Sequence, residues 1–423
     1  MWQTLKNAWA IEDIRKKILY TLFILLLYRL GSFVPVAGVN VTFIRAATAN
    51  YDILGLMNML TGGSFGNYTI FAMGISPYIT SSIIIQLLTV AIPKLEAMQK
   101  EGDEGRKKLA QYTRYATVIL AFIQAVGIIL GLGYDAILHD PIIPDWITYI
   151  TIGLTLMAGS ALVMWMGERI TENGIGNGIS LLIFAGIVAQ LPANAYSMLL
   201  NTFEGLIGFW VLPVVLLGAL VIIAGITFID MGERRVPVQY AKRVTGRRTY
   251  GGQSTHIPMK VNASGVMPLI FAMSMISFPQ VIMQFWPDSA FYAWYIKWLG
   301  SGTVVHTIIY MLLIVGFSFF YSAISFNPIE VSKNIQEYGG FIPGIRPGRP
   351  TSDYFSRISK RLVLVSAVFL GLVAAVPQVF SSFTGMNSPF GPTSLLIMVS
   401  VALETTKQLE AQMMMRHYKG FLN

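Results

Sequence analysis

Cysteine is absent from this chain of 423 residues, and charged side chains are scarce. Without cysteine, the protein can form no disulfide framework, no thiolate metal site and no cysteine nucleophile. Only 12% of its residues are Asp, Glu, Lys or Arg, against roughly 25% in soluble domains. A soluble protein of this length needs more charge to cover its surface, so the composition indicates a surface that faces lipid.

Groups that carry chemistry are missing from the apolar segments. Between Leu362 and Leu403 there is no Asp, Glu, Lys, Arg or His. Ion-coupled transporters need ionisable groups at membrane depth, so this absence disfavours them. We find no Ser/His/Asp set, no intramembrane pair of carboxylates and no HExxH motif, which argues against an enzyme. The four histidines are far apart in sequence, so we predict no metal site and no cofactor.

Long apolar runs dominate the rest of the chain. A helix needs roughly 20 mostly apolar residues to cross a bilayer, and ten segments approach that length. They are Ile18–Val34, Thr69–Ile92, Tyr115–Gly133, Trp146–Gly167, Gly178–Met198, Leu206–Ile229, Val261–Trp286, Thr303–Phe326, Leu362–Ser381 and Thr393–Gln412. We therefore predict an all-α integral membrane protein with ten transmembrane helices.

The basic residues predict the orientation of these helices. If the N-terminus is cytoplasmic, all but three of the 30 Lys and Arg residues fall on the cytoplasmic side. The exceptions are Arg45 and Lys297 in external loops and Arg29 near the outer end of the first helix. Because cytoplasmic loops are enriched in Lys and Arg, we expect both termini in the cytoplasm. We interpret Arg29 as an interfacial anchor that snorkels towards water.

The chain divides into two halves of five helices, residues 1–204 and 205–423. An odd number of helices per half requires the second half to insert inverted, and such repeats place the functional path between the halves. Pro77-Tyr78-Ile79 and Pro268-Leu269-Ile270 occupy corresponding helices. Prolines are common in membrane helices, so chance also explains this pair.

Two long cytoplasmic loops, about 230–260 and 327–361, are basic and rich in Gly and Pro. One interpretation is that they contact anionic lipid headgroups. The other is that they form a docking surface for an acidic partner or for ribosomal RNA, since Arg and Lys clusters bind phosphate. The shorter run Gly174-Ile175-Gly176-Asn177-Gly178 follows no strand and lacks a P-loop lysine, so we interpret it as a flexible turn.

The first external loop contains an apolar segment that is too short to span a membrane. From its pattern alone, a helix on the membrane surface is favoured over one that folds back into the protein. Polar uncharged residues inside the predicted helices have two interpretations as well. Each forms a single interhelical hydrogen bond, or together they line a seam that opens.

Several long motifs resemble the SecY family of bacteria, over essentially the whole chain. They include Gly74–Leu88, Gln111–Tyr115, Ile170–Glu172 with Gly174–Ser180, and Gly344–Gly348. The resemblance implies two five-helix halves around a central pore through which unfolded polypeptides cross the membrane. It further implies lateral release of signal sequences and membrane helices into lipid. A passive channel is thereby favoured over a secondary transporter or a membrane enzyme.

The resemblance also implies roles for particular residues. An aliphatic pore ring falls on Ile75, Ile79, Ile179, Ile183, Ile270 and Ile397. A plug, about residues 51–64, falls on the external apolar segment with Tyr51, Ile53, Leu54, Leu56, Met57, Met59 and Leu60, which replaces the surface-helix interpretation. A lateral gate falls on Thr80, Gln86, Gln124, Ser274 and Ser277. Rings of branched apolar side chains exclude water and ions.

Partners follow from the same resemblance. The basic loops match docking surfaces for the ribosome and for the SecA motor ATPase, through Arg234, Arg235, Arg243, Arg247, Arg248, Arg346 and Arg349. Small subunits, SecE and SecG, are expected beside the channel, with preproteins and signal peptides passing through it. We expect the protein in the bacterial cytoplasmic membrane.

Overall fold

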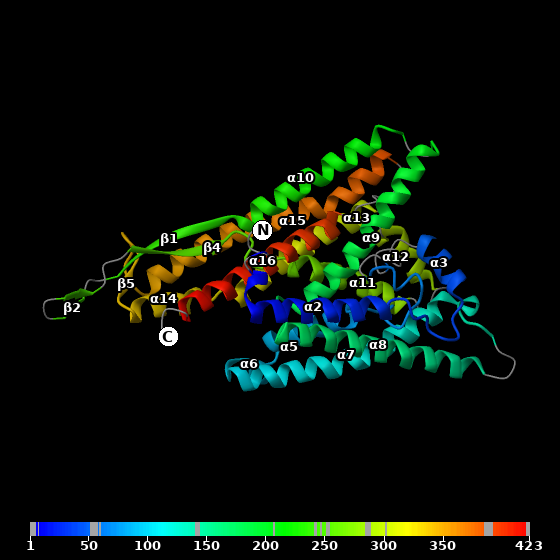
Figure 1. Ribbon diagram of the computed structural model, residues 1–423, viewed down its shortest axis with the longest axis horizontal. Coiled ribbons are helices and arrows are strands. Elements are labelled where there is room, and N and C mark those ends of the chain that lie inside the picture. The colour runs from blue at the N-terminus through cyan, green and yellow to red at the C-terminus, as the bar shows by residue number, and fades with distance from the viewer. Residues whose placement is uncertain are drawn as a thin grey trace.

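The computed structural model of the protein is mostly helical. It describes residues 6, 8–50, 58, 61–139, 144–205, 208–240, 243–245, 248–250, 254–283, 289–300, 303–384 and 392–419. The helices of the first half are α2 (Glu12–Gly31), α3 (Val41–Asn50), α5 (Ser76–Ala91), α6 (Pro93–Lys100), α7 (Asp103–Leu132), the 3-10 turn η1 (Tyr134–Ala136), α8 (Asp145–Asn173) and α9 (Gly178–Phe203). The long helices lie lengthwise beside one another (Figure 1).

The second half combines helices with short strands. Its helices are α10 (Val211–Met231), α11 (Met267–Met283), α12 (Ala290–Leu299), α13 (Val304–Ser325), α14 (Pro328–Glu337), α15 (Arg349–Thr384) and α16 (Pro392–Lys419). Its strands are β1 (Glu233–Tyr240), β2 (Arg243–Thr245), β3 (Arg248–Tyr250), β4 (Ser254–Lys260) and β5 (Gly340–Phe341). The all-α prediction is therefore corrected by strands that project from one end of the bundle (Figure 1).

Each predicted span coincides with a helix, although the helices differ from the predictions at their ends. Within the described residues, six helices are long and apolar enough to cross a membrane, and a seventh span results if α5 and α6, bent by 101°, count as one. The apolar segment predicted at Leu362–Ser381 lies within α15, which begins earlier, at Arg349. Hydropathy marks only the part of a helix that lies in lipid, whereas the helix continues into water.

The connection from α8 to α9 is the predicted turn into the fifth helix, and it is closely packed. The Asn177 side chain caps α9 by accepting from the backbone N–H groups of Ile179 and Ser180, at 3.1 and 3.3 Å. The Thr21 hydroxyl of α2 accepts from the Ile175 N–H at 3.1 Å. Gly176 has φ +82°, a conformation that favours glycine. The glycines thus allow a tight turn from α8 to α9 that packs against α2.

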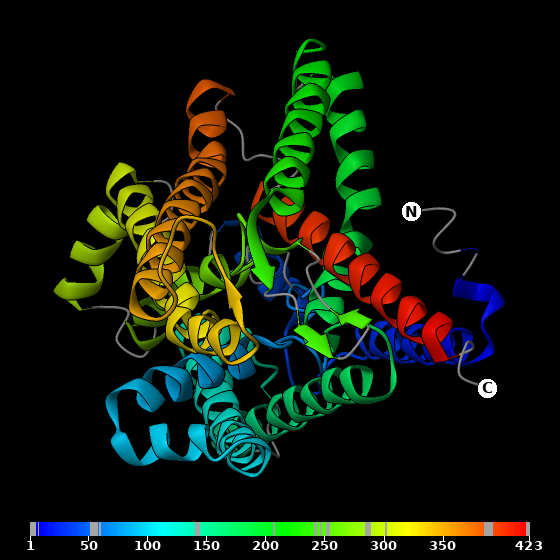
Figure 2. The same ribbon diagram turned by 90° about the vertical axis from the view of Figure 1, so that its left-hand side faces the viewer.

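Contacts between helices define two groups that meet along two seams. In the first group α7 packs on α5 and α8, and α8 packs on α9. In the second, α13 packs on α11 and α15, and α10 packs on α16. Across the first seam α11 contacts α5 and α7, and across the second α9 contacts α10 and α16. Figure 2 shows the bundle from the end that carries the strands.

The two long basic loops, about residues 230–260 and 327–361, fold together into one unit, which we call the platform. Strand β1 pairs antiparallel with β4 from the first loop and with β5 from the second. Val236 and Val238 of β1 are buried against Phe355 at the start of α15. The alternation of buried and exposed residues along β1 is that of a strand with one covered face. The platform therefore has a small apolar core separate from that of the bundle.

Candidate functional site

The six isoleucines predicted for a pore ring lie in one apolar cluster of the bundle. Ile75, Ile183 and Ile397 are buried, at 8%, 8% and 1% exposure. The partly buried members that pack against the same cluster are Ile79, Ile179 and Ile270. They come from α5, α9, α11 and α16 and from the residue preceding α5, so both groups of helices contribute. The cluster also contains other large apolar residues, so burial alone does not set these six apart.

An irregular segment, residues 61–75, lies against this cluster. A Cβ atom added at Gly62 would lie 2.8 Å from the Cα of Gly186 in α9. A Cβ added at Gly74 would lie 2.9 Å from the Cγ2 of Thr61. Gly74 precedes Ile75, and Gly186 lies one helical turn after Ile183. The Thr61–Gly62 turn is therefore seated directly beside two of the six isoleucines.

Two polar side chains hold this turn from neighbouring helices. The Arg29 guanidinium of α2 donates to the Gly62 carbonyl at 2.8 Å and lies 5.0 Å from the centre of the Phe33 ring. The Gln190 amide of α9 donates to the Asn58 carbonyl at 3.0 Å. The prediction of Arg29 as an interfacial anchor is wrong, because the side chain turns inward. The sequence did contain a signal for this, because Arg29 is the lone charge within an apolar span. Such charges commonly face the interior of a bundle and pair with backbone carbonyls.

The plug assignment cannot be placed, since Tyr51, Ile53, Leu54, Leu56, Met57, Met59 and Leu60 all lie outside the described residues. Of the predicted segment, Asn58 and Thr61–Ser64 are described. Thr61, Gly62 and Ser64 are buried, and Gly66 donates its N–H to the Asn58 side chain at 2.7 Å.

The predicted lateral-gate residues lie on the helices of the first seam. Thr80 and Gln86 are on α5, Gln124 is buried on α7 and Ser274 is partly buried on α11. Ser277 is also on α11, and its side chain is outside the described part of the structure. Thr80 donates to the Ser76 carbonyl and Gln86 to the Ser82 hydroxyl, both within α5. These two bonds stabilise their own helix and do not tie α5 to α11.

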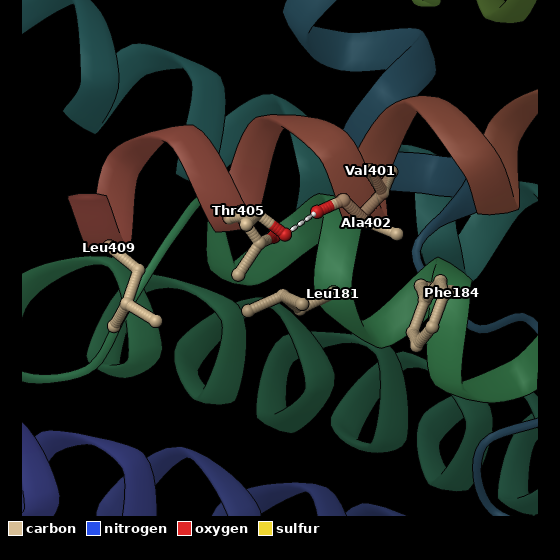
Figure 3. Close-up of a pocket in the computed structure, with 7 residues that line it drawn as sticks. Leu181, Phe184, Val401, Ala402, Thr405 and Leu409 are labelled. Atoms are coloured by element: carbon tan, nitrogen blue, oxygen red, sulfur yellow. Dashed lines mark hydrogen bonds between the residues drawn. The ribbon is translucent and has the colours of Figure 1, made fainter. Parts of the chain in front are cut away.

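The second seam contains an apolar cavity that sequence reasoning did not identify. It has a volume of about 160 Å³ and lies between α9 and α16. Figure 3 shows Leu181 and Phe184 on one side and Val401 and Leu409 on the other. The dashed line in Figure 3 is the bond from the Thr406 hydroxyl to the Ala402 carbonyl, at 2.6 Å within α16. The cavity shows that α9 and α16 are incompletely packed where the two groups meet.

A buried polar network at the base of α10 was also missed. The Asp230 carboxylate accepts from the Asn262 amide at 2.6 Å and from the Ser400 hydroxyl. Asn262 in turn accepts from the Ser366 hydroxyl at 3.1 Å, and Lys407 donates to the Asp230 carbonyl at 3.1 Å. The network joins α10, α15 and α16 beneath the platform. Asp230 ends an apolar run, and only tertiary structure shows that it faces inward.

The predicted docking arginines are on the platform. Arg346 and Arg349 are exposed, in the connection from β5 to α15 and at the first residue of α15. Thr351 donates to the Arg346 carbonyl at 2.9 Å, and Ser332 donates to the Gly348 carbonyl at 2.7 Å. The connection is thus held from α14 and α15 while its guanidinium groups face water.

The other docking candidates are on the strands. Arg234 and Arg235 are exposed on β1, and Arg235 pairs with Glu233 at 2.7 Å. Arg243 and Arg248 are on β2 and β3, and their side chains are not among those described. Arg247 lies outside the described residues.

Exposed tryptophans mark the two ends of the long helices. Trp146, Trp210, Trp294 and Trp298 are 51–64% exposed at the end away from the platform. At the platform end, Trp9 and Trp165 are exposed, and the Arg169 guanidinium lies 5.7 Å from the Trp165 ring centre. Tryptophan is enriched at both interfaces of a membrane. Together with the apolar helices, these belts define a multi-pass helical membrane protein whose two groups of helices meet at an apolar centre.

Comparison with known proteins identifies the family. The sequence profile of the SecY family matches residues 69–406. The chain is 45% identical to the protein translocase subunit SecY of Streptomyces scabiei, over 98% of each chain. The chain therefore belongs to the SecY family.

Solved structures show the same fold. A structure described as that of a protein conducting channel superposes with a TM-score of 0.67 at 20% identity, covering 94% of this chain and 92% of the other. Sec61 in the canine ribosome-channel complex superposes with a TM-score of 0.63 at 19% identity, covering 94% and 92%.

Proposed function

We propose that unfolded polypeptides cross the membrane through this chain at the six-isoleucine cluster. The chain is the central channel subunit of the Sec protein translocase, by its family membership, and is not an enzyme. One observation carries the assignment of the constriction: isoleucines from α5, α9, α11 and α16 reach one cluster from both groups of helices. Branched apolar side chains exclude water when the path is empty and deform around a passing chain without binding it.

All ten predicted helices span the bacterial cytoplasmic membrane in this proposal, with both termini and the platform in the cytoplasm. Residues 1–204 and 205–423 form the two inverted halves. The distribution of Lys and Arg supports this orientation. The tryptophan belts support the depth at which the bundle sits.

Lateral release of signal sequences and membrane helices takes place at the first seam, between α5 and α7 on one side and α11 on the other. Thr80 and Gln86 bond within α5, so separating α5 from α11 breaks neither of these bonds. The segment of residues 51–64 seals the resting channel from the external side. Its apolar composition within an external loop supports this role.

The platform docks the SecA motor and the ribosome, with Arg346 as the principal contact and Arg349 beside it. The exposure of both residues supports this, as does the ribosome-bound state of the canine relative. Energy for transport comes from these partners. SecE and SecG complete the complex, in keeping with the description of the bacterial relative as a subunit.

Ion conductance of the purified chain in planar bilayers tests the constriction. We expect the wild type to be nearly silent and to open when a signal peptide is added. Ile183→Ser should conduct without signal peptide, because a hydroxyl in the ring retains water. Ile152→Ser is the matched control, since Ile152 is also buried, at 0% exposure against 8% for Ile183, but belongs to a different apolar cluster.

The outcomes separate the parts of the proposal. Silence of the wild type even with signal peptide would contradict the channel assignment. A silent Ile183→Ser beside a signal-activated wild type would show that the ring is elsewhere. Deleting residues 51–57 alone tests the seal and leaves Asn58 and Gly62 in place. The channel with this deletion should show brief openings without signal peptide.

A further inference from the structure

Arg29 is the one basic residue within the apolar part of a predicted span, and the structure gives it a specific partner. Neighbouring side chains of α2, such as Leu26 and Leu30, are 58% exposed and suited to lipid. Arg29 instead is partly buried and donates to the Gly62 carbonyl at 2.8 Å. A charge at membrane depth is costly and is retained where it has a function.

Gly62 occupies a position that depends on close packing. The residue is buried, has φ +67°, and leaves no room for a Cβ against the backbone of Gly186. Thr61 beside it fills the space over Gly74, which leads into Ile75. The turn therefore covers the external side of the cluster at α9 and at the start of α5.

A second polar contact secures the same turn. Gln190, one helical turn after Gly186, donates to the Asn58 carbonyl at 3.0 Å. The Asn58 side chain accepts from the Gly66 N–H at 2.7 Å, so the backbone on both sides of the turn is held. Irregular backbone at membrane depth is tolerated only where its polar groups are satisfied within the protein. Arg29 and Gln190 satisfy two of its carbonyls from two different helices.

We propose that Arg29 and Gln190 form a two-point clamp that holds the Thr61–Gly62 turn against the external side of the isoleucine ring and thereby sets the resting leak of the channel. This inference rests on the proposed pore. The two residues are positioning residues, because they act through the turn and do not line the path. Without the clamp the turn leaves the ring more often, and ions then cross a single barrier in place of two.

The first test is signal-independent ion conductance in planar bilayers. Arg29→Met should raise this conductance about 10- to 100-fold. This is the factor by which losing a hydrogen bond from a charged donor should shift the equilibrium between the held and the released turn. Arg29→Lys keeps a charged donor, so its conductance should lie between that of Arg29→Met and that of the wild type. Gln190→Leu removes a neutral bond and should raise conductance about 2- to 10-fold. Arg45→Met is the matched control, because Arg45 bonds to Asn67 at 2.6 Å in the same external region and is exposed.

The second test returns the turn to its place by a separate link. The chain has no cysteine, and a Cβ at position 74 would lie 3.8 Å from the Cβ of Thr61, a typical Cβ–Cβ distance for a disulfide. Oxidised Thr61→Cys/Gly74→Cys, placed in the Arg29→Met background, should return the conductance to the wild-type level. Reduction of the same sample should restore the leak. A purely structural role of Arg29 would not be reversed in this way.

Each result decides between the clamp and the pore. Wild-type conductance in both Arg29→Met and Gln190→Leu, beside a leaking Ile183→Ser, overturns the clamp and leaves the pore intact. A leak that the disulfide does not silence also overturns the clamp. If no variant leaks and signal peptide does not open the wild type, the proposed pore itself is contradicted. Should Arg29→Met not fold, Gln190→Leu in the same disulfide background decides.

Discussion

The two ends of the molecule deal with irregular backbone in opposite ways. Away from the platform, residues 61–75 lie inside the bundle, where Arg29 and Gln190 bond to carbonyls of the Asn58–Gly62 stretch. At the other end, the long loops leave the bundle and build the platform around their own apolar core. Backbone near lipid must find all its hydrogen bonds within the protein, whereas backbone in water can present charge to a partner. This difference is the reason that we propose sealing for the buried segment and docking for the platform.

The largest effect is expected from the platform core. Phe355 is fully buried there, and Phe355→Ala should destabilise the platform by about 3–5 kcal/mol, the range for truncating a buried aromatic ring. Protease cleavage between β1 and β4 should accelerate while the bundle keeps its thermal unfolding midpoint. Leu364→Ala, on the same helix at an exposed site, is the control. Equal loss in bundle and platform would contradict two separate cores.

The packing of the irregular segment, residues 61–75, should be sensitive to added volume. Gly159 of α8 packs directly on the Ile70 carbonyl, so a methyl group there displaces the irregular segment. Gly159→Ala should destabilise the protein by about 1–3 kcal/mol, measured as thermal unfolding in detergent. Gly218→Ala in α10 meets no neighbouring atom within 4 Å and should be neutral or stabilising by up to about 1 kcal/mol. Similar shifts of the unfolding midpoint in both variants would show that the close contact between Gly159 and the Ile70 carbonyl has no special role.

Charge reversal on the platform should affect transport without affecting the fold. Arg346→Glu should lower SecA-driven preprotein translocation about tenfold or more, because it places like charges at the docking contact. Arg349→Glu should have a smaller effect, and neither should change resting conductance or thermal unfolding. A greater loss in Arg349→Glu than in Arg346→Glu would move the docking contact to the start of α15.

The smallest effect is expected at His139, in the connection from η1 to α8. Its Nδ1 lies 2.9 Å from the Asp145 carboxylate, and its Nε2 lies 3.0 Å from the Tyr134 carbonyl. Only the protonated ring donates to both acceptors. The hydrogen bond to Asp145 raises the pKa of His139 above its usual 6.5, with smaller contributions from the Tyr134 carbonyl and the charges of Asp145 and Asp135.

Because this pKa is raised on folding, the stabilisation is complete below pH 6.5 and is lost as pH rises through the folded-state pKa. Hydrogen exchange over residues 134–148, corrected for intrinsic rates, should be slower at pH 5.5 than at pH 8. Asp145→Asn should remove most of the difference. A difference that persists in His139→Gln would assign the pH dependence to another group.

The sequence was most informative where a residue's role depends on solvent. Each of the apolar runs overlaps a helix of the structure, because crossing lipid requires about 20 apolar residues whatever the neighbours are. The first turns of α15, from Arg349 to Arg361, were not predicted as helix for the same reason, since hydropathy does not detect a polar helix in water. The strands of the platform were missed because they are short and polar on one face, and their pairing joins residues from loops far apart in sequence.

By itself, the sequence determined a multi-pass helical membrane protein, its family and the residue types of its centre. Composition and motif are local properties, and they do not depend on how helices pack. The tertiary structure alone decided which way Arg29 points, that Gln190 and Arg29 hold one turn, and that a cavity lies between the contacting helices α9 and α16. Those facts concern partners more than a hundred residues apart in two of the three cases. Contacts at such separation follow from the packing of whole helices, which no spacing along the chain records.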